Sequence, residues 1–423
     1  MKVYQANILF TSSSTHFDVY ERGYIAVDDC GIIQGVYDAL PEDFTYDQLV
    51  DFGDKLLIPA MNDMHVHAPQ FANMGVAMDM QLLPWLNTYV FPEEAKFADE
   101  AYAETIYHSF VSELWRQGTM RAAVFATVHT PATHILARTF DEAGMGAWIG
   151  LVGMDRHAPA NLCNTSAEWE AGIQTLTDAL ASMPLVKPII TPRFIPSCTP
   201  EMLRCMGEVA KQTLLPVQSH LSENKQEIAW VKELEPESSC YGDAYYRYGL
   251  FGQTPTLMAH CCYTDGEELQ LMREQNVYAV HCPTSNCNLA SGIAPVRKLL
   301  QQGVNVALGS DIAGGHHLSM FRVMQYAVQM SKLQYTASDG KYPFLTLSEV
   351  FHMATKIGGS LFGKVGSFEK GYAFDALVID DLCLSPHHLI TSSPIERLER
   401  FVYLGDDRHI QHRFCQGNEI KQV

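Results

Sequence analysis

The stretch LLIPAMNDMHVHA, residues 56–68, decides the interpretation of the whole chain. It starts as an apolar run and ends in the pair His65-x-His67, as a buried strand with polar residues at its end does. On a strand, residues two apart point to the same face, so both imidazoles can aim at one point, as a metal ion requires. Two histidines on a strand are also compatible with ordinary, partly buried positions. A metal site therefore needs further ligands at the ends of other strands.

Composition indicates a globular protein with one large domain and a smaller one. The chain has 423 residues, of which 47% are apolar and 18% are charged. The net charge of -19 argues against a nucleic-acid backbone as partner, because phosphates repel an acidic surface. A single base or nucleoside remains compatible as a substrate.

The cysteines and the N-terminus indicate a reducing compartment. Eleven cysteines are scattered without a Cys-x-x-Cys pair, which favours reduced core thiols over disulfides or structural zinc. Residues 1–20 lack a basic start followed by an apolar run, and no window approaches about 18 uninterrupted apolar residues. We therefore expect no signal peptide, no membrane span and, by default, a cytoplasmic protein.

The central part of the chain alternates between strand and helix patterns. Apolar runs rich in β-branched residues occupy 56–68, 120–130, 147–154, 186–196, 215–223, 255–263, 277–283 and 304–312. Helical spacing follows at 94–117, 167–182, 201–212 and 266–274. Such alternation implies parallel strands, and eight repeats predict a (β/α)₈ TIM-like barrel. An open doubly wound sheet is the alternative, although no Gly-x-Gly-x-x-Gly turn follows the first strand.

Both ends of the chain have β character. Short apolar runs with turn signals occur at 3–12 and 24–37, and again at 372–380, 400–404 and 410–415. We expect the two ends to pair into one small β-sandwich domain made of residues 1–57 and 365–423. Residues 58–364 then form the catalytic barrel.

Candidate ligands lie where the predicted strands end. His65 and His67 close the first strand, His220 the fifth, His260 the sixth and Asp311 the eighth. Each residue alone has a structural explanation, such as a helix cap for Asp311. Barrel enzymes place their chemistry at the carboxyl ends of the strands, so the joint pattern favours a site.

Imidazoles with one carboxylate suit Zn²⁺ or Fe²⁺ better than Mg²⁺ or Ca²⁺, which prefer oxygen ligands. An open coordination position would hold a water with a pKa brought toward neutrality. Glu223, three residues after His220, is placed to act as a proton shuttle. The structural alternative for Glu223 is an acidic residue at a helix N-terminus, and both explanations can hold together.

Several stretches resemble a known family. They are HAPQ (67–70), LLPWL (82–86), FPEE (91–94), TPRF (191–194), QSHLSEN (218–224), HCPTSN (281–286), GSDIAGG (309–315) and YLGDDR (403–408). Together with the His and Asp set, they resemble the amidohydrolase superfamily and, more narrowly, its mononuclear deaminases of cytosine, adenosine and guanine. They are most similar to the guanine deaminase family, over nearly the whole chain.

The resemblance implies a role for each candidate. The metal, one Zn²⁺ per chain with Fe²⁺ as the alternative, would be bound by His65, His67, His220 and Asp311. His260 would hydrogen-bond the water on the metal. Glu223 would protonate a ring nitrogen and then pass a proton to the leaving amine, while Asp311 would accept a proton from the attacking water.

The resemblance also implies the substrate contacts. Gln70 and Arg193 would read the purine edge, with Arg193 facing the carbonyl oxygen, while Phe194 packs on the ring and His220 borders it. Without the resemblance, we would interpret Gln70 as a loop amide, Arg193 as a surface ion pair and Phe194 as core. Pro69 departs from the family pattern, because it removes a backbone donor and stiffens the loop that presents Gln70.

The implied activity is hydrolysis of a C–N bond in a cyclic amidine: guanine to xanthine and ammonia. A homodimer without nucleic-acid or membrane partners is implied as well. One alternative is a related deaminase of another purine, a pterin or a triazine, and the other is a metal-free structural relative without activity. Lys187 stands at the start of its strand, which argues against a carbamylated-lysine binuclear site. His316 and His317 are expected to be exposed loop residues.

Overall fold

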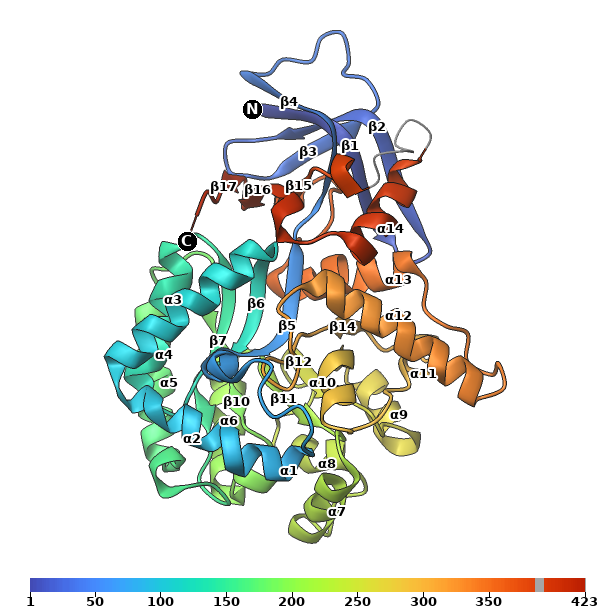
Figure 1. Cartoon of the computed structure of the whole chain (residues 1–423). Coiled ribbons are helices and arrows are strands. Elements are labelled where there is room, and N and C mark those ends of the chain that lie inside the picture. The colour runs from blue at the N-terminus through green and yellow to red at the C-terminus, as the bar shows by residue number, and fades with distance from the viewer. Residues whose placement is uncertain (385–391, 423) are drawn as a thin grey trace.

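A computed structural model describes residues 1–384 and 392–422, and its larger part is a ring of parallel strands (Figure 1). The strands are β5 (Met61–His67), β6 (Thr119–Phe125), β7 (Gly146–Gly150), β9 (Val186–Pro188), β11 (Val217–Leu221), β12 (Thr256–His260), β13 (Tyr278–His281) and β14 (Val306–Leu308). Two short strands, β8 (Val152–Gly153) and β10 (Thr191–Pro192), follow β7 and β9 and pair with each other. Each of the eight predicted runs overlaps one strand of the ring, and the fold is TIM-barrel-like.

The ring consists of two groups of four strands that meet at two seams. The orders are β5-β6-β7-β9 and β11-β12-β13-β14, and the parallel bridge Ile190–Val217 joins them on one side. On the other side, the amide of Asp311 donates to the carbonyl of His65 at 2.8 Å, and that of His67 to Ile312 at 3.2 Å. A Cβ on Gly309 would lie 2.8 Å from Cβ of His65, so this second seam requires glycine there. The seam therefore brings the first and eighth strand ends together.

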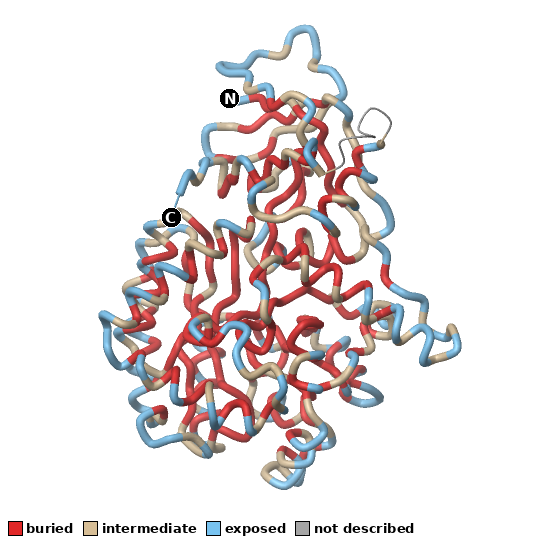
Figure 2. The backbone as a smooth tube through the Cα atoms, in the orientation of Figure 1, coloured by how far each residue is buried: buried red, intermediate tan, exposed pale blue. Residues whose placement is uncertain are grey.

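Helices cover the outside of the ring. They are α3 (Glu100–Arg116), α4 (Thr130–Glu142), α5 (Ser166–Leu180), α6 (Pro200–Thr213), α7 (Lys225–Leu234), α8 (Tyr241–Tyr246), α9 (Gly266–Glu274), α10 (Pro283–Asn288), α11 (Val296–Gln301), α12 (Met320–Ala337) and α13 (Leu347–His352). The helix α5 shows why: Thr165 and Glu168 form a capping box, and Trp169, Ile173 and Leu176 recur at helical spacing toward the core. Figure 2 shows the strands buried and the outer helix faces exposed.

The two ends of the chain share one seven-stranded sheet. Its members are β1 (Lys2–Ser13), β2 (His16–Val27), β3 (Ile33–Tyr37), β4 (Gln48–Pro59), β15 (Ala376–Ile379), β16 (Ile410–Cys415) and β17 (Asn418–Glu419). The order β17-β16-β15-β4-β1-β2-β3 places the C-terminal strands beside the N-terminal ones. Aromatic rings fill its own core, where Tyr4 stacks on Phe374 with ring centroids 4.8 Å apart.

The predicted first barrel strand, residues 56–68, is in fact two strands. Pro59 ends β4 and pairs with Ala376 in the seven-stranded sheet, whereas Met61 starts β5 and pairs with Thr119 in the ring. The chain therefore passes from one sheet to the other between Pro59 and Met61. The run is buried in both sheets, so no polar residue marks the change.

The predicted β run at 400–404 is wrong, because these residues end the helix α14 (Pro394–Leu404). Ser393 caps it in a box with Glu396, and Leu398, Phe401 and Val402 form its buried face. The four apolar residues 401–404 are too few to distinguish the period of a strand from that of a helix. The helix cap at Ser393 lies outside the predicted run.

Two further observations concern disulfide bonds and membrane-spanning helices. None of the eleven cysteines, all within the described ranges, forms a disulfide. Across those same ranges, no helix combines the length and apolar character that crossing a membrane requires.

Candidate active site

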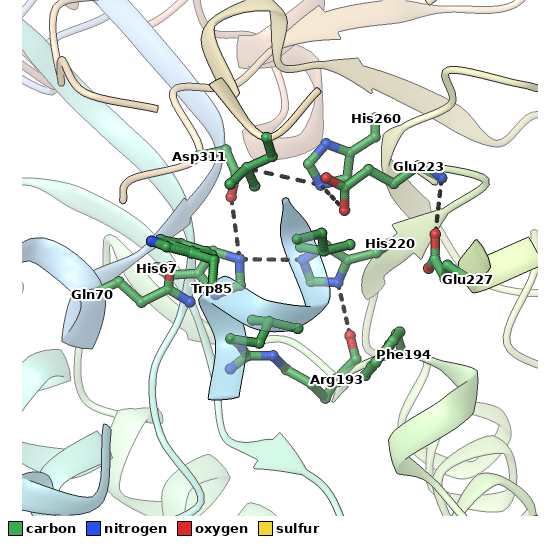
Figure 3. Close-up of a pocket in the computed structure, with 13 residues that line it drawn as sticks. His67, Gln70, Trp85, Arg193, Phe194, His220, Glu223, Glu227, His260 and Asp311 are labelled. Atoms are coloured by element: carbon green, nitrogen blue, oxygen red, sulfur yellow. Dashed lines mark hydrogen bonds and ion pairs between the residues drawn. The ribbon is translucent and has the colours of Figure 1, made fainter. Parts of the chain in front are cut away.

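The predicted ligands meet at the carboxyl ends of the strands, and Figure 3 shows His67, His220 and Asp311 among them. Oδ1 of Asp311 lies 3.2 Å from Nε2 of His65 and 3.4 Å from Nε2 of His67. Nε2 of His67 lies 3.2 Å from Nε2 of His220. Nε2 of His260 lies 3.8 Å from Oδ2 of Asp311. Five side chains from four strand ends thus form two overlapping sets of three, each with its ligand atoms within 4.8 Å of one another: His65, His220 and His260, and His65, His67 and Asp311.

The proton positions on two imidazoles follow from their outer partners. Nδ1 of His220 bonds to the carbonyl of Arg193 at 2.8 Å, and a carbonyl only accepts, so Nε2 of His220 keeps its lone pair. Nδ1 of His260 bonds to Oδ1 of Asn286 at 2.9 Å, which also leaves Nε2 free to accept. Nε2 of His65 is buried and has no hydrogen-bond partner. The free lone pairs of His220 and His260 and the unpaired Nε2 of His65 lie close together, as the ligands of a divalent cation do.

Burial keeps the cluster in its ligating form. Desolvation lowers the pKa of His67 to about 3 and shifts the pKa values of His65 and His220 below their ordinary value. Burial also raises the pKa of Asp311, but the imidazoles of His65 and His67 beside its carboxylate outweigh this effect and hold that pKa well below its usual range. Neutral imidazoles and an ionised carboxylate are the forms that bind metal.

The backbone at three strand ends is left-handed. Ser222, His260 and Asp311 have φ angles of 46°, 72° and 49°. For residues with a Cβ, such a conformation costs of order 1–3 kcal/mol and persists where the surroundings enforce it, as in active sites. Buried Asp63 supplies part of that enforcement by accepting the amides of Ser310 at 2.9 Å and His65 at 3.3 Å.

Glu223 is placed beside the cluster as an acid. Its Oε1 accepts from Ser291 Oγ at 2.7 Å, and its Oε2 lies 3.5 Å from Nε2 of His260. Desolvation and then the charge of Asp311 raise the pKa of Glu223 above its ordinary value. A raised pKa favours a protonated carboxyl that can donate.

The loop of Glu223 is held from behind by a second buried acid. Glu227 accepts the backbone amides of Glu223 at 3.1 Å and Asn224 at 3.2 Å, and its other oxygen accepts from Tyr241 at 2.8 Å. Asn224 and Glu227 form the capping box of α7, so Glu227 holds both the start of that helix and the backbone of Glu223.

One pocket joins these groups. Of the predicted site residues, it is lined by His67, Gln70, Arg193, Phe194, His220, Glu223, His260 and Asp311. His65 stands behind them. Lining residues that sequence reasoning gave no role are Leu82, Trp85, Leu86, Glu227 and Leu289.

Two of the side chains predicted to contact the substrate are held by hydrogen bonds to other groups of the protein. Arg193 is buried, not a surface residue, and its Nη1 donates to both carboxylate oxygens of Glu94 at 2.7 and 2.9 Å. Gln70 donates through Nε2 to the same carboxylate at 3.1 Å and accepts the amide of Ala313 at 3.1 Å. Phe194 is buried against the pocket. Glu94 is therefore a site residue that sequence reasoning missed.

The missed residues come mainly from one segment over the pocket. It contains α1 (Leu82–Trp85), a π-turn (Leu86–Val90) and α2 (Phe91–Glu94). Both stretches, LLPWL and FPEE, contribute to the family resemblance, but nothing in their spacing assigns a role. The available signal was a pair of acids, Glu93 and Glu94, that follows the apolar residues 89–92.

The structure also places Pro69 and the two adjacent histidines, His316 and His317. Pro69 stands in the first turn of the 3₁₀ helix Ala68–Asn73, where a backbone N–H lacks a helical partner anyway, so its absence costs little. His317 is exposed as expected, but His316 is half-buried and bonds to Asn288 Nδ2 at 2.9 Å. Neither belongs to a metal-type cluster within the described ranges.

A TIM-barrel-like fold whose strand ends gather histidines, an aspartate and a protonatable glutamate in one pocket defines a hydrolase of the metal-dependent class. A family model described as the Amidohydrolase family matches residues 56–420. The guanine deaminase of Dictyostelium discoideum is 36% identical over 100% of this chain and 98% of its own length. That of Escherichia coli K12 is 33% identical over 88% and 84%.

A solved structure extends the similarity to three dimensions. The guanine deaminase of C. acetobutylicum, with guanine bound in its active site, is 48% identical and covers 99% of both chains with a TM-score of 0.96. The chain belongs to the amidohydrolase family and, within it, to the guanine deaminases.

Proposed function

We propose that this protein hydrolyses guanine to xanthine and ammonia, the reaction named for its relatives. One observation carries the proposal. The acid Glu223 and the N–H donors of Gln70 and Arg193 line the same buried pocket as the His and Asp cluster. A neutral, planar base needs such an apolar slot with a few placed polar groups, and needs no charge on the protein.

The metal would be bound by His65, His67, His220 and Asp311, as one Zn²⁺ per chain with Fe²⁺ as the alternative. When bound, such an ion lowers the pKa of a water toward neutrality and so supplies the nucleophile. His260 hydrogen-bonds that attacking water, since its Nε2 faces both Asp311 and Glu223.

The protein residues move the protons. Glu223 begins protonated and donates to the ring nitrogen N3 as the water oxygen bonds to C2, while Asp311 accepts one proton of the water. Glu223 takes the second water proton, from the new hydroxyl on C2, and passes it to the exocyclic nitrogen, and the proton held by Asp311 then restores Glu223 to its protonated form. The C2–N bond then breaks, the C2 carbonyl forms and ammonia leaves.

The opposite side of the pocket holds the base. Gln70 and Arg193 donate to its 6-oxo edge, Phe194 packs on the ring and His220 borders it. Trp85 and Leu86 close the slot and exclude water, which strengthens each polar contact within it.

The rest of the molecule supports this site. We propose that residues 58–364 form a closed (β/α)₈ catalytic barrel, and that 1–57 with 365–423 form a small β-sandwich domain. The family resemblance favours a homodimer, and eleven cysteines without a disulfide favour the cytoplasm.

The proposal is tested by ammonia release from guanine beside adenine, cytosine and melamine, with zinc-loaded protein. We expect release from guanine alone. Release from another base with none from guanine would favour the related deaminase of a different heterocycle. Protein that binds no metal after zinc supplementation would favour the inactive structural relative.

A further inference from the structure

We infer that Glu94 sets the hydrogen-bond polarity of the substrate pocket, so that it presents N–H donors alone to the 6-position of the purine. The inference rests on the proposed function and makes Glu94 a positioning residue for specificity. Its side chain is 3% exposed, and it connects the two side chains proposed to read the base.

The orientation of the Gln70 amide follows from its two protein partners. A backbone amide only donates, so the group facing Ala313 N at 3.1 Å must be the Gln70 oxygen. An ionised carboxylate only accepts, so the group facing Glu94 Oε1 at 3.1 Å must be the nitrogen. A flipped amide would lose both bonds. Its nitrogen would face the N–H of Ala313, and its oxygen would face the carboxylate of Glu94. The second N–H of Gln70 is thus left for a ligand acceptor.

The same carboxylate orients Arg193. Nη1 of Arg193 bonds to both oxygens of Glu94, at 2.7 and 2.9 Å, and no other N–H of that guanidinium bonds to protein within the described ranges. A buried charge requires a buried partner, so Glu94 both holds and neutralises the arginine. The pocket therefore offers donors without net charge, which suits a neutral base.

Two donors select an acceptor at the position they face. A 6-oxo group accepts from Gln70 and Arg193, whereas a 6-amino group would direct its own N–H atoms at them. A site built to hydrogen-bond one group rejects the analogue that leaves its buried polar groups unpaired. Glu94 touches neither metal nor the reacting carbon in this scheme, so its effect is on selection.

The test compares kcat/KM for guanine and 2,6-diaminopurine, which both carry the amine at C2 and differ at C6 and, with it, in the proton on N1. Wild-type protein is expected to prefer guanine by at least about 100-fold. Glu94→Gln keeps the size of the side chain but can donate as well as accept. We expect it to lower guanine kcat/KM by about 100-fold or more and to reduce the preference by at least about 10-fold.

The matched control is Glu93→Gln on the same helix. Glu93 is buried but pairs with Lys96 and Tyr102, away from the pocket. It should leave rate and preference unchanged. Glu94→Asp, which keeps the acceptor, should restore most of the preference, and metal content and melting temperature report folding of every variant.

Three results would overturn the inference. The first is a wild-type preference below about 10-fold, the second is an unchanged preference in Glu94→Gln, as equal losses on both bases would give, and the third is wild-type guanine kcat/KM in Glu94→Gln. The wild-type comparison stands even if Glu94→Gln does not fold. Wild-type protein that releases ammonia from 2,6-diaminopurine but not from guanine would refute the proposed function itself, and the two failures are thereby distinguished.

Discussion

The carbonyl oxygen of Arg193 accepts a 2.8 Å hydrogen bond from Nδ1 of His220, while its guanidinium bonds to Glu94. One residue therefore orients a proposed metal ligand through its backbone, and its side chain is the one proposed to face the substrate edge. Substitution of the side chain can separate the two roles, because the carbonyl remains.

Arg193→Ala should keep the metal and lose recognition. We expect guanine kcat/KM to fall by about 100-fold or more, with a smaller loss on 2-aminopurine, which lacks the 6-oxygen. The variant also leaves Glu94 buried without a partner, so its free energy of unfolding should drop by about 3–5 kcal/mol. Ammonia release, metal analysis and denaturant unfolding measure the three effects. Equal losses on both bases would contradict the assigned contact.

Removal of the metal should abolish activity reversibly. Dialysis against a chelator is expected to stop ammonia release and lower the melting temperature, because an ion that binds only the folded state stabilises it. Zn²⁺ should restore both, at roughly one ion per chain. His67→Ala should resist this rescue. Full activity in protein shown by elemental analysis to be metal-free would refute the assignment.

Glu223→Gln should separate metal binding from proton transfer. The amide keeps the acceptor for Ser291 but carries no acidic proton, so turnover should fall by at least about 100-fold. Metal content should remain that of the wild type, because Glu223 is outside the proposed ligand set. Near-normal turnover would remove Glu223 from the proton path.

His352 should make the protein less stable in acid. Burial, followed by the charge of Lys356, lowers the pKa of His352 to about 4, and its Nδ1 lies 3.0 Å from Thr11 Oγ1. Between an ordinary value of about 6.5 and 4, the unfolded chain binds a proton that the folded chain does not. The free energy of unfolding therefore falls as pH falls through this window, by about 3 kcal/mol at most.

His352→Gln tests that contribution, because glutamine does not titrate. Denaturant unfolding at pH 7 and pH 4.5 should show a smaller acid loss in this variant than in the wild type. His108→Gln, on the exposed face of α3, is the control and should follow the wild type. Parallel curves for all three proteins would exclude His352 as a source of acid sensitivity.

Some features could be predicted because they repeat at short range. Alternating strand and helix patterns locate the eight ring strands, since burial on both faces demands apolar runs at each one. Polar ligands at strand ends could be found because parallel strands direct their carboxyl ends to one side. The spacing of His65 and His67 on one strand face needed no tertiary information.

Other features depend on partners far along the chain. The split of residues 56–68 between two sheets depends on Ala376 and Thr119, and residues 401–404 belong to a helix that a cap at Ser393 begins. Glu94 looked like an ordinary acid near the start of a helix. Its role arises from Arg193, 99 residues away in sequence.

The sequence by itself determined the type of the chemistry: which side chains are available as ligands and acid, and which ends of which strands carry them. The tertiary structure decided how those groups are used. Proton positions on His220 and His260, the polarity of Gln70 and the partner of Arg193 depend on distances of about 3 Å. Hydrogen bonds act only at such distances and are strongest where water is excluded, and only the folded ring brings these atoms together.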